Sequence, residues 1–569
     1  MRKINAKKYL ICGIFLLNCL GFAVPARILF LFPISLGSHF RAFFPVMEEL
    51  AARGHEITAY VNSDLKRAEP MRNYREILVR ADPNATSFKD FDFIGTRTAS
   101  IFQYTLNLWN IFAPMTDDAL RSSALQGLMK SQEQFDVIIV HGATILQEPL
   151  LGFAHKFEAP VINLHPIAVT PLMASLTGIP NPLSYVPDFR LPYPERMNFW
   201  QRVNNLIIAA FDVLGGHFYF LPSQEEVMRR NFRSEALPPL RDLIANISLH
   251  LVLSHPMMHI RPYGPNVVQI SGTQIKPATE LPEDLKKFMD EAQDGVIYFS
   301  LGSFIQPSFF SDQMKRVLTE TLKSVRQRVI LKWPEKLDGD PKHIFQKSWL
   351  PQTGILAHPN CKLFITHGGI NSLVEVMTAG VPTLGLPMFA DQFHNVAYYE
   401  HIGVGLNANI DDNFTIEEFT RKINRILNTP SFAENSKRWA TIYRDLPETS
   451  LERAVFWVEY VIRHKGAHHL KPASATMPFH KYMLLDVIAF CSAVFILILY
   501  ILIWTVCKTL RILKLILGLG YLIDACQPCA GMEDCRKAFA PTQTAHQDQG
   551  LHRSCPGGIQ GRSNVHPKQ

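Results

Sequence analysis

Residues 349–392 read WLPQTGILAHPNCKLFITHGGINSLVEVMTAGVPTLGLPMFADQ, and this stretch decides the fold. Residues 362–366 form an apolar run that predicts a buried strand, His367-Gly368-Gly369 predicts a tight turn, and residues 371–379 predict a helix. A strand that enters a helix through glycines exposes backbone N–H groups at the positive end of the helix dipole. The stretch therefore predicts an anion site. A plain α/β connection has the same local pattern, so the surrounding side chains must decide.

The polar side chains around this turn fit a nucleotide diphosphate-sugar. Trp349 offers a flat face for a base, and Gln352 can reach a ribose. Ser372 is placed to meet a phosphate with its hydroxyl. Glu375 lies one helical turn further on the same face and can accept from ribose hydroxyls. A base, a ribose and a phosphate each have a matching group in this stretch.

A second strand end carries similar residues. Residues 295–301 form an apolar run that ends in Gly302 and Ser303, and we expect both to face the diphosphate. Asp391 and Gln392 follow the apolar run 383–389 and supply an acceptor and a donor for sugar hydroxyls. The expected donor-binding residues are Gly302, Ser303, Trp349, Gln352, His367, Gly369, Asn371, Ser372, Glu375, Asp391 and Gln392.

The order of these motifs resembles the donor-binding signature of the UDP-glycosyltransferase family, the UDP-glucuronosyl- and UDP-glucosyltransferases. The matching elements are W-x-P-Q, T-H-G-G, N-S, E, G-x-P, P and D-Q. The resemblance implies a GT-B architecture, in which two Rossmann-like, doubly wound α/β domains face each other across a cleft. It also implies inverting transfer from a UDP-sugar co-substrate, with no metal and no other cofactor. Asp338-Gly339-Asp340 is accordingly interpreted as a solvated turn.

The N-terminal half places a histidine at the edge of a predicted sheet. Residues 27–32 predict a strand, residues 41–53 a helix and residues 56–61 the next strand, with a turn at residues 37–39. His39 thus follows the first strand, where open α/β sheets bind ligands. A histidine there can take a proton from an acceptor hydroxyl near neutral pH. Most histidines have no such role, but G-S-H after the first strand matches the catalytic histidine of the family.

The partner of His39 departs from the family pattern. Family members orient this histidine with a carboxylate after a later strand, here residues 135–140, and the matching position holds His141. A neutral imidazole cannot stabilise an imidazolium as a carboxylate does. Glu148 is the nearest substitute, and it is equally well explained as an acid at the start of a helix expected at residues 150–157. If Glu148 is the partner, Glu148→Gln lowers activity steeply.

Length and composition allow two folded domains and a membrane segment. The chain has 569 residues, 47% of them hydrophobic and 19% charged, and a net charge of +7 without a basic stripe for nucleic acid. Pro262 and Pro265 mark a linker. We therefore expect an acceptor-binding domain at residues 27–265, a UDP-sugar-binding domain at 266–445 and a returning helix with a membrane-proximal segment at 446–486.

Both ends of the chain predict the secretory pathway and a membrane. Residues 1–26 combine a basic start, an apolar run and small residues near a cleavage site, which is typical of a signal peptide. Residues 487–507 are long and apolar enough to cross a bilayer as a transmembrane helix. Lys508, Arg511 and Lys514 follow this run, so the positive-inside rule predicts a single-pass type I protein with luminal domains. The family resemblance implies the endoplasmic reticulum.

Three glycosylation sequons fit luminal exposure, at Asn84, Asn246 and Asn413. Residues 508–569 predict a disordered cytosolic tail, and they lack the terminal dilysine that is usual in the family.

The acceptor is expected to be a small lipophilic alcohol or phenol, because residues 100–116 and 167–221 are rich in Phe, Leu, Met, Trp and Pro. Leu253 stands where glucuronosyl members carry an arginine, which favours glucose as the transferred hexose. Two alternatives stay open: transfer from UDP-glucuronate, and a catalytically silent membrane protein that binds UDP-sugars or lipids. A homo-oligomer is compatible with each of these functions.

Overall fold

The computed structural model describes residues 25–34, 37–62, 71–80, 82, 95, 99–142, 146–233, 236–258, 260–275, 280–410 and 414–517. The chain divides into two units, Met1–Met477 and Pro478–Gln569. Most of the expected leader, the sequons at Asn84 and Asn413, and the tail beyond Leu517 lie outside the described residues.

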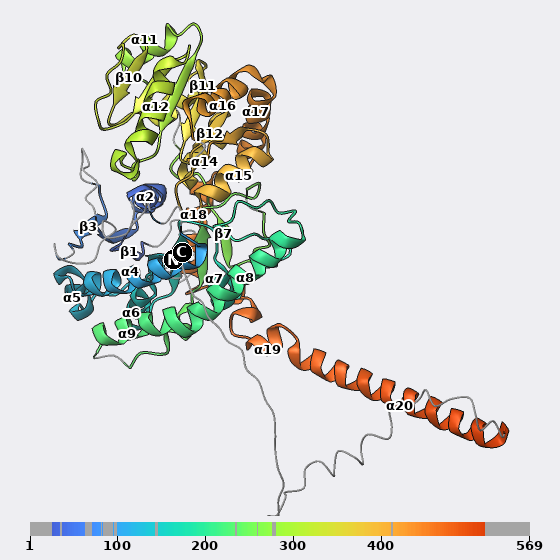
Figure 1. The fold of residues 1–569 in the computed structure, drawn as a ribbon. Helices are drawn as coiled ribbons and strands as arrows, with labels where there is room; N and C mark the ends of the chain where they lie inside the picture. The colour runs from blue at the N-terminus through green and yellow to red at the C-terminus, as the bar shows by residue number, and fades with distance from the viewer. Residues whose placement is uncertain are drawn as a thin grey trace, which may run out of the picture. The chain divides into compact units, whose positions relative to one another are not determined.

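The first half of unit one is built on a seven-stranded sheet in which every pairing is parallel (Figure 1). Its order is β3-β2-β1-β4-β5-β6-β7, and the strands are β1 (Arg27–Phe32), β2 (Glu56–Val61), β3 (Tyr74–Leu78), β4 (Val137–His141), β5 (Val161–His165), β6 (Leu249–Val252) and β7 (Val267–Gln269). The strand order reverses between β1 and β4. Open α/β sheets bind ligands beyond the carboxyl ends of the strands at such a reversal.

The second half repeats this arrangement with six parallel strands. The order is β10-β9-β8-β11-β12-β13, with β8 (Val296–Ser300), β9 (Arg328–Lys332), β10 (Ile344–Lys347), β11 (Cys361–Thr366), β12 (Thr383–Gly385) and β13 (Gly405–Asn407). Here the order reverses between β8 and β11, where Ser300 lies opposite Thr366. The predicted architecture of two doubly wound sheets is confirmed.

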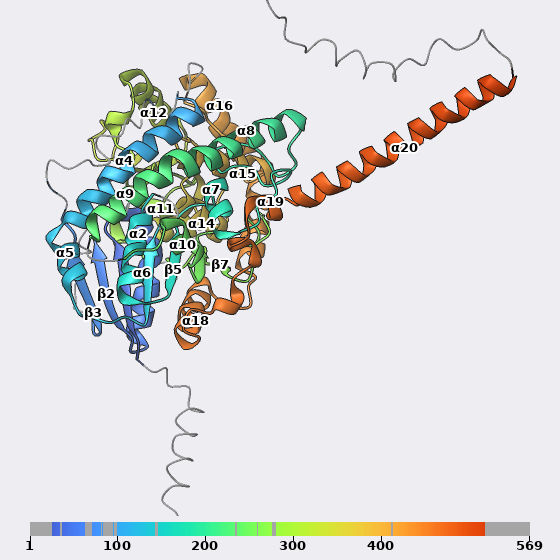
Figure 2. The ribbon, with the colours of Figure 1, turned by 90° about the horizontal axis from the view of Figure 1, so that it is seen from below.

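Helices cover the first sheet. They are α2 (Gly37–Ala52), α4 (Ile101–Arg121), α5 (Ser123–Lys130), α6 (Gly152–Phe157), α7 (Pro171–Thr177), α8 (Phe199–Gly215), α9 (Leu221–Asn231) and α10 (Leu240–Ala245), with the 3-10 turn η2 (Glu148–Leu151) and the π-helical turn η3 (Gly216–Phe220). The expected turn at residues 37–39 is wrong, because α2 already begins at Gly37 and carries His39 in its first turn. In Figure 2, α4, α8 and α9 lie side by side.

The helices of the second half are α11 (Glu283–Asp290), α12 (Asp312–Ser324), α13 (Gln352–Ala357), α14 (Ile370–Ala379), α15 (Gln392–His401), α16 (Ile416–Asn428) and α17 (Pro430–Arg444), with the 3-10 turn η4 (Pro307–Phe309). The returning helix α18 (Ser450–Arg463) follows, and it packs against α2 and β7 of the first half. The sequence predicts one continuous helix over residues 436–462. The structure breaks it because Pro447 cannot continue a helix and Thr449 caps α18 together with Glu452.

One hydrophobic cluster joins the two halves. It contains buried side chains of β1 and α2 together with those of β8, α14 and α18, for example Phe30, Tyr298 and Val458. The far faces of the two sheets have separate clusters. The first sheet extends beyond the expected boundary at residue 265, because β7 pairs with β6.

Unit one ends with η5 (His468–Leu470) and η6 (Ala473–Ala475), and unit two begins with α19 (Phe479–Tyr482). The long helix α20 (Leu485–Leu517) contains the expected span and is long and apolar enough to cross a membrane. The expectation that disorder begins at residue 508 is wrong for the first residues of the tail, because α20 continues to Leu517.

Candidate active site

A cleft of about 750 Å³ lies where the reversals of the two sheets meet, and it is lined by residues from both halves. His39 and His141 line it from the first half. All eleven residues expected to bind the donor line it from the second half. His39 and His367, more than three hundred positions apart in the chain, share one cavity because they follow β1 and β11, each at the reversal of its sheet.

His39 lies on the first turn of α2, directly beyond β1. The side chain borders the cleft and is partly accessible to it. Burial lowers the pKa of His39 to about 4. The imidazole is therefore neutral at physiological pH, which is the state that can accept a proton.

His141 ends β4 and lies next to His39, with ring centroids 5.4 Å apart. Burial, and then the proximity of His39, lower the pKa of His141 well below its usual value. No carboxylate is recorded in contact with either ring in the part of the chain that the structure describes. The two rings form a neutral pair.

Gln147 fixes the orientation of His141. Its amide nitrogen donates to the carbonyl oxygens of Ile34, at 2.8 Å, and of His141, at 3.1 Å. The same nitrogen lies 3.2 Å from Nδ1 of His141. Nε2 is buried and has no partner among the described residues. Sequence reasoning missed Gln147, which stands beside the residue that it did select.

Glu148 does not line the cleft. Its Oε1 accepts from the backbone N–H of Leu146 at 3.1 Å, and its Oε2 is buried without a partner among the described residues. Burial raises the pKa of Glu148 to about 8. The structure thus records no contact that would let this carboxyl orient His39, and the expected partnership has no geometric support.

The turn between β11 and α14 offers bare backbone to the cleft. Gly369 is the N-cap of α14, and no side chain caps this end. A Cβ atom on Gly369 would lie 2.5 Å from Nε2 of His367, and one on Gly302 would lie 2.7 Å from Cε1 of the same ring. Gly302 also has φ +80°, which favours glycine, whereas at Gly369 a side chain would require the imidazole of His367 to shift. Burial, followed by the nearby charge of Lys332, lowers the pKa of His367 to about 4.

Glu375 and Gln352 form a polar pair further along α14. Gln352 accepts from the hydroxyl of Tyr298 at 2.9 Å and donates to the carboxyl group of Glu375. Burial raises the pKa of Glu375 to about 7. Trp349, with 59% of its surface exposed, borders the same region, and the cations of Arg41 and Lys332 lie 4.8 and 4.6 Å from its ring.

Asp391 and Gln392 are held by local bonds at the start of α15. Asp391 accepts from the amide of Asn395 at 2.6 Å, and burial raises the pKa of Asp391 to about 6. Gln392 uses its carbonyl oxygen to accept from the backbone of Met388 at 2.8 Å. Both side chains are therefore fixed before any sugar arrives.

A hydrogen bond connects two residues that line the cleft from opposite halves. The amide of Asn371, in the first turn of α14, donates to the carbonyl oxygen of Ser38 at 3.0 Å, and Gln274 donates to Asn371 at 3.1 Å. Ser38 directly precedes His39. The N-terminal end of α14 is thus tied to the residue next to His39.

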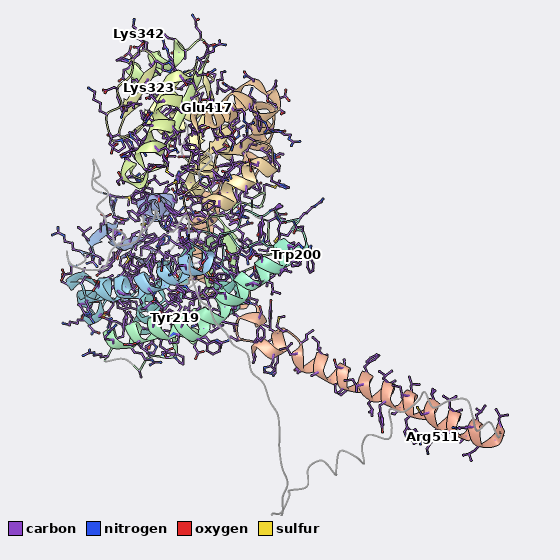
Figure 3. The ribbon with its side chains drawn as sticks, in the orientation of Figure 1. Trp200, Tyr219, Lys323, Lys342, Glu417 and Arg511 are labelled. Atoms are coloured by element: carbon purple, nitrogen blue, oxygen red, sulfur yellow. The ribbon has the colours of Figure 1, made fainter. Side chains whose placement is uncertain are left out.

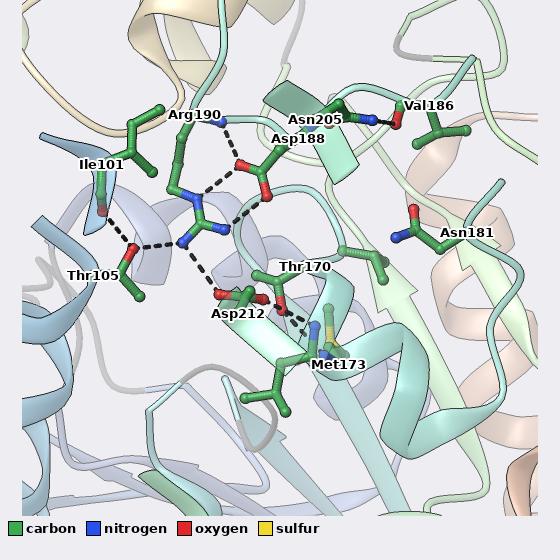
Figure 4. A network of polar contacts seen from close by, with 12 residues as sticks. Ile101, Thr105, Thr170, Met173, Asn181, Val186, Asp188, Arg190, Asn205 and Asp212 are labelled. Atoms are coloured by element: carbon green, nitrogen blue, oxygen red, sulfur yellow. Dashed lines mark hydrogen bonds and ion pairs between the residues drawn. The ribbon is translucent and has the colours of Figure 1, made fainter. Parts of the chain in front are cut away.

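The other end of the cleft is apolar, with a buried ionic cluster in its wall (Figure 4). Its apolar lining includes Tyr104, Leu108, Trp109, Phe112, Phe189 and Phe220. Arg190 donates to both carboxylate oxygens of Asp188, each at 2.7 Å, to Thr105 at 2.7 Å and to Asp212 at 3.2 Å. Burial opposes ionisation of Asp188, but the Arg190 guanidinium outweighs it and lowers the pKa of Asp188. Sequence reasoning did not identify this cluster.

Two other expectations concern residues outside the cleft. Asn246 is exposed at the end of α10, and its side-chain oxygen accepts from Lys471 at 2.8 Å. Asp340 accepts from the backbone of Lys342 at 2.9 Å within an exposed turn.

The two facing parallel sheets with a shared cleft have the GT-B architecture. Solved structures agree: the glycosyltransferase of kitacinnamycin covers 78% of this chain and 100% of its own with a TM-score of 0.53 at 15% identity. The calicheamicin glycosyltransferase CalG4 covers 78% and 99% with a TM-score of 0.51 at 16% identity. These likenesses concern the fold.

The sequence matches the family model "UDP-glucoronosyl and UDP-glucosyl transferase" over residues 28–516, so the chain belongs to this family of UDP-glycosyltransferases. UDP-glycosyltransferase UGT5 of Dactylopius coccus is 33% identical over 88% of this chain and 95% of that protein. The 2-hydroxyacylsphingosine 1-beta-galactosyltransferase of Rattus norvegicus is 30% identical over 84% of this chain and 88% of its own. The protein is thus an enzyme that transfers a glycosyl group from a UDP-sugar.

Proposed function

We propose that the protein transfers a hexosyl group, glucose in preference to others, from a UDP-sugar to a hydroxyl of a small lipophilic acceptor, with inversion and without a metal ion. The observation that carries the proposal is the position of His39. It faces the same cleft as the uncapped N-terminus of α14, and the bond from Asn371 to Ser38 ties the two together.

The donor is bound along the second half of the cleft. The uracil stacks on the exposed face of Trp349, where it takes the place of one of the two flanking cations. The ribose hydroxyls bond to Gln352 and Glu375, which are already paired. The two phosphates rest on the backbone N–H groups of α14 and on Ser372, and the sugar hydroxyls meet Asp391 and Gln392.

In the reaction, the neutral imidazole of His39 takes the proton of the acceptor hydroxyl while that oxygen attacks the anomeric carbon. The new C–O bond forms on the face opposite the diphosphate, and the bond to the diphosphate oxygen breaks, so the configuration inverts. UDP leaves with the electron pair of the broken bond. The helix dipole of α14 and the side chains of His367 and Ser372 stabilise the charge that develops on the leaving oxygen.

The proposed preference for glucose is based on the residue that follows β6, Leu253. Leu253 is buried there within the shared hydrophobic cluster, so this position supplies no cation to a sugar carboxylate. Glucuronate would bring a negative charge that this position leaves without a partner.

The proposed location is the endoplasmic reticulum, with unit one in the lumen and α20 as a single-pass anchor. The basic residues Lys508, Arg511 and Lys514 near the end of α20 support a cytosolic C-terminus.

A second candidate is transfer of glucuronate from UDP-glucuronate. The family model covers both glucuronosyl and glucosyl transferases.

One experiment separates the two candidates. Membranes that contain the full chain are given a simple phenol with UDP-glucose or, separately, UDP-glucuronate, and the release of UDP is measured. We expect phenol-dependent release with UDP-glucose, and we expect His39→Ala to lower it by a factor of about 10² to 10⁴.

His401→Ala is the matched control, because His401 is an exposed histidine at the end of α15. It should keep the full rate, and both variants should bind UDP as the unmodified protein does. Release of UDP from UDP-glucuronate and not from UDP-glucose would make glucuronate the transferred sugar. Equal rates for His39→Ala and the unmodified chain would overturn the assignment of the base.

A further inference from the structure

Helix α8, the turn η3 and helix α9 form one continuous helical segment, Phe199–Asn231, that is apolar enough to be a candidate membrane span. It cannot cross a bilayer in this fold. Asn205 is fully buried and donates to the carbonyl oxygens of Leu183 and Val186, both at 2.9 Å. Asp212 accepts from Arg190 and from the backbone of Leu172, at 2.9 Å. One side of the segment therefore belongs to the protein core.

The other side of the segment is apolar and exposed. Its large exposed side chains, which we call the apolar face, are Phe199, Trp200, Leu206, Ile207, Leu214, Phe218 and Tyr219. Trp200 is 75% exposed and Phe218 81%. The seven residues recur at intervals of about seven and four, which places them on one stripe of a helix. Figure 3 shows Trp200 and Tyr219 toward the two ends of this stripe.

The charge distribution along the segment is that of an interfacial helix. Between residues 203 and 219 the single Asp, Glu, Lys or Arg is Asp212, which is buried. Arginines lie at both ends. Arg196 precedes the stripe and Arg202 lies in its first turn, and beyond the stripe Arg229, Arg230, Arg233 and Arg241 line a groove together with Glu225 and Glu226. An apolar stripe with arginines at its ends suits a lipid surface, where the stripe enters the acyl region and the guanidinium groups meet phosphate.

The chain leaves unit one close to this face. In η6, the hydroxyl of Ser474 donates to the carbonyl oxygen of Gly178 at 2.8 Å, at the end of α7. Helix α7 in turn packs on the segment: Gly216 approaches Leu172 so closely that a Cβ atom there would lie 2.4 Å from Cδ1 of the leucine. The exit point and the apolar face are thus separated by one short helix.

Helix α20 begins ten residues after Ala475, which is a reach of at most about 35 Å at 3.3 to 3.6 Å per residue. With α20 in a bilayer, the apolar face stays within this reach of the lipid at all times. Binding is then intramolecular, and its effective concentration is high.

We propose that the apolar face of α8 and η3 docks on the surface of the lipid bilayer in which α20 is inserted. The face lies parallel to the membrane plane and buries its aromatic and aliphatic side chains at the boundary between headgroups and acyl chains. This surface is separate from the catalytic cleft. The proposal rests on the proposed membrane insertion of α20, and the test below measures docking of the apolar face and insertion of α20 separately.

The test uses the full chain in phosphatidylcholine vesicles that contain a phosphatidylcholine with a photoactivatable diazirine in its acyl chain. After illumination, tryptic peptides are analysed for attached lipid. Cleavage after Arg202 and Arg229 releases residues 203–229, which carry five members of the apolar face. We expect lipid on this peptide as well as on peptides of α20.

The double variant Ile207→Glu with Leu214→Glu should lower labelling of the peptide at least tenfold relative to labelling of α20. Ile416→Glu, which adds a charge to an exposed apolar side chain on α16, should leave both unchanged. Labelling of residues 203–229 no stronger than that of α16, with α20 labelled, would overturn the docking surface and leave the anchor in place. Cross-links between two copies through this peptide, without lipid on it, would assign the face to a dimer instead. Absence of lipid from both peptides would overturn the anchor as well.

Discussion

The candidate base His39 lies next to a neutral partner, His141, rather than next to a carboxylate. Burial lowers the pKa of both rings, so His39 stays unprotonated far below neutral pH. A base with a low pKa is available at every physiological pH, but it has little driving force to take a proton. With His141 in place of a carboxylate, His39 is therefore a weaker base, but it stays unprotonated over the whole physiological pH range.

Replacement of His141 by aspartate tests this effect. An anion beside His39 favours its protonated form and raises its pKa, by one to three units for a close carboxylate. The rate of transfer falls as the pH drops through the pKa of the base. The acid limb of the pH-rate profile should therefore move upward in His141→Asp relative to the unmodified enzyme, and the rate at pH 7 should rise.

His141→Asn is the control, because it removes the imidazole without adding charge. The acid limb of His141→Asn should stay near that of the unmodified enzyme. If aspartate and asparagine give the same profile, His141 does not influence the base electrostatically.

Glu148 is a buried carboxyl whose ionisation the fold opposes. Its pKa of about 8 in the folded protein lies above its ordinary value of 4.5, so the folded state holds this proton more tightly than the unfolded state. The contribution to stability is fully present below pH 4.5 and is lost as the pH rises to about 8. We expect Glu148→Gln to be more stable than the unmodified protein at pH 8, by on the order of 3 to 5 kcal/mol, since each unit is worth about 1.4 kcal/mol.

Denaturant unfolding of both proteins at pH 5 and pH 8 measures this difference. The gap should be small at pH 5 and large at pH 8. A gap independent of pH would mean that Glu148 is ionised in the folded protein. Since Glu148 does not line the cleft, the variant should also keep its activity, which is the opposite of the result expected if Glu148 were the partner of His39.

The predicted site residues that line the cleft share one physical reason. His39, Gly302 and His367 each follow an apolar run, and the carboxyl ends of parallel strands meet at one edge of a sheet. Gln147 and Arg190 could not be predicted in this way. Gln147 bonds to Ile34, 113 positions away, and Arg190 to Thr105, 85 positions away, so their roles exist only in the folded chain.

At the scale of elements, strands were easier to predict than helices. Residues 27–32 and 56–61 were predicted as strands with the bounds that β1 and β2 have, because buried parallel strands are continuous apolar runs. Helices α4 and α8 lie in segments that showed no clear pattern. In α8 the exposed side is as apolar as the buried side, which removes the periodicity that marks an amphipathic helix.

Gly302 tests the strand-to-helix turn as an element. It has φ +80°, and a Cβ atom there would meet the ring of His367. Gly302→Ala should therefore push His367 away from the diphosphate, and we expect the affinity for UDP to fall about tenfold, or about 1.4 kcal/mol. Titration calorimetry of the detergent-solubilised chain measures this change.

Gly127→Ala is the control, because a Cβ atom at Gly127 in α5 would meet nothing within 4 Å. Its affinity for UDP should be unchanged. Equal affinities for both variants would show that UDP binding does not depend on the position of His367 beside Gly302.

At the scale of the whole molecule, the two halves of unit one share a core. The hydrophobic cluster that contains Phe30 of β1 also contains Tyr298 of β8 and Val458 of α18. Glu459 of α18 adds an ion pair with Arg53 of the first half, at 3.3 Å. If one half unfolds, the apolar side chains that the other half contributes to this cluster become exposed to water. Independent unfolding of one half therefore has a large free-energy cost.

We therefore expect unit one to unfold in a single thermal transition. We also expect UDP to raise the midpoint temperature of that whole transition. At one hundred times its dissociation constant, a ligand that binds only the folded state adds about 2.7 kcal/mol to the free energy of unfolding. Scanning calorimetry of the full chain in detergent, with and without UDP, measures both effects. Glu459→Ala should lower the midpoint and keep one transition, because Val455 and Val458 remain in the shared cluster. Two transitions, of which UDP moves only one, would mean that the donor half folds by itself and that the shared cluster does not couple the halves.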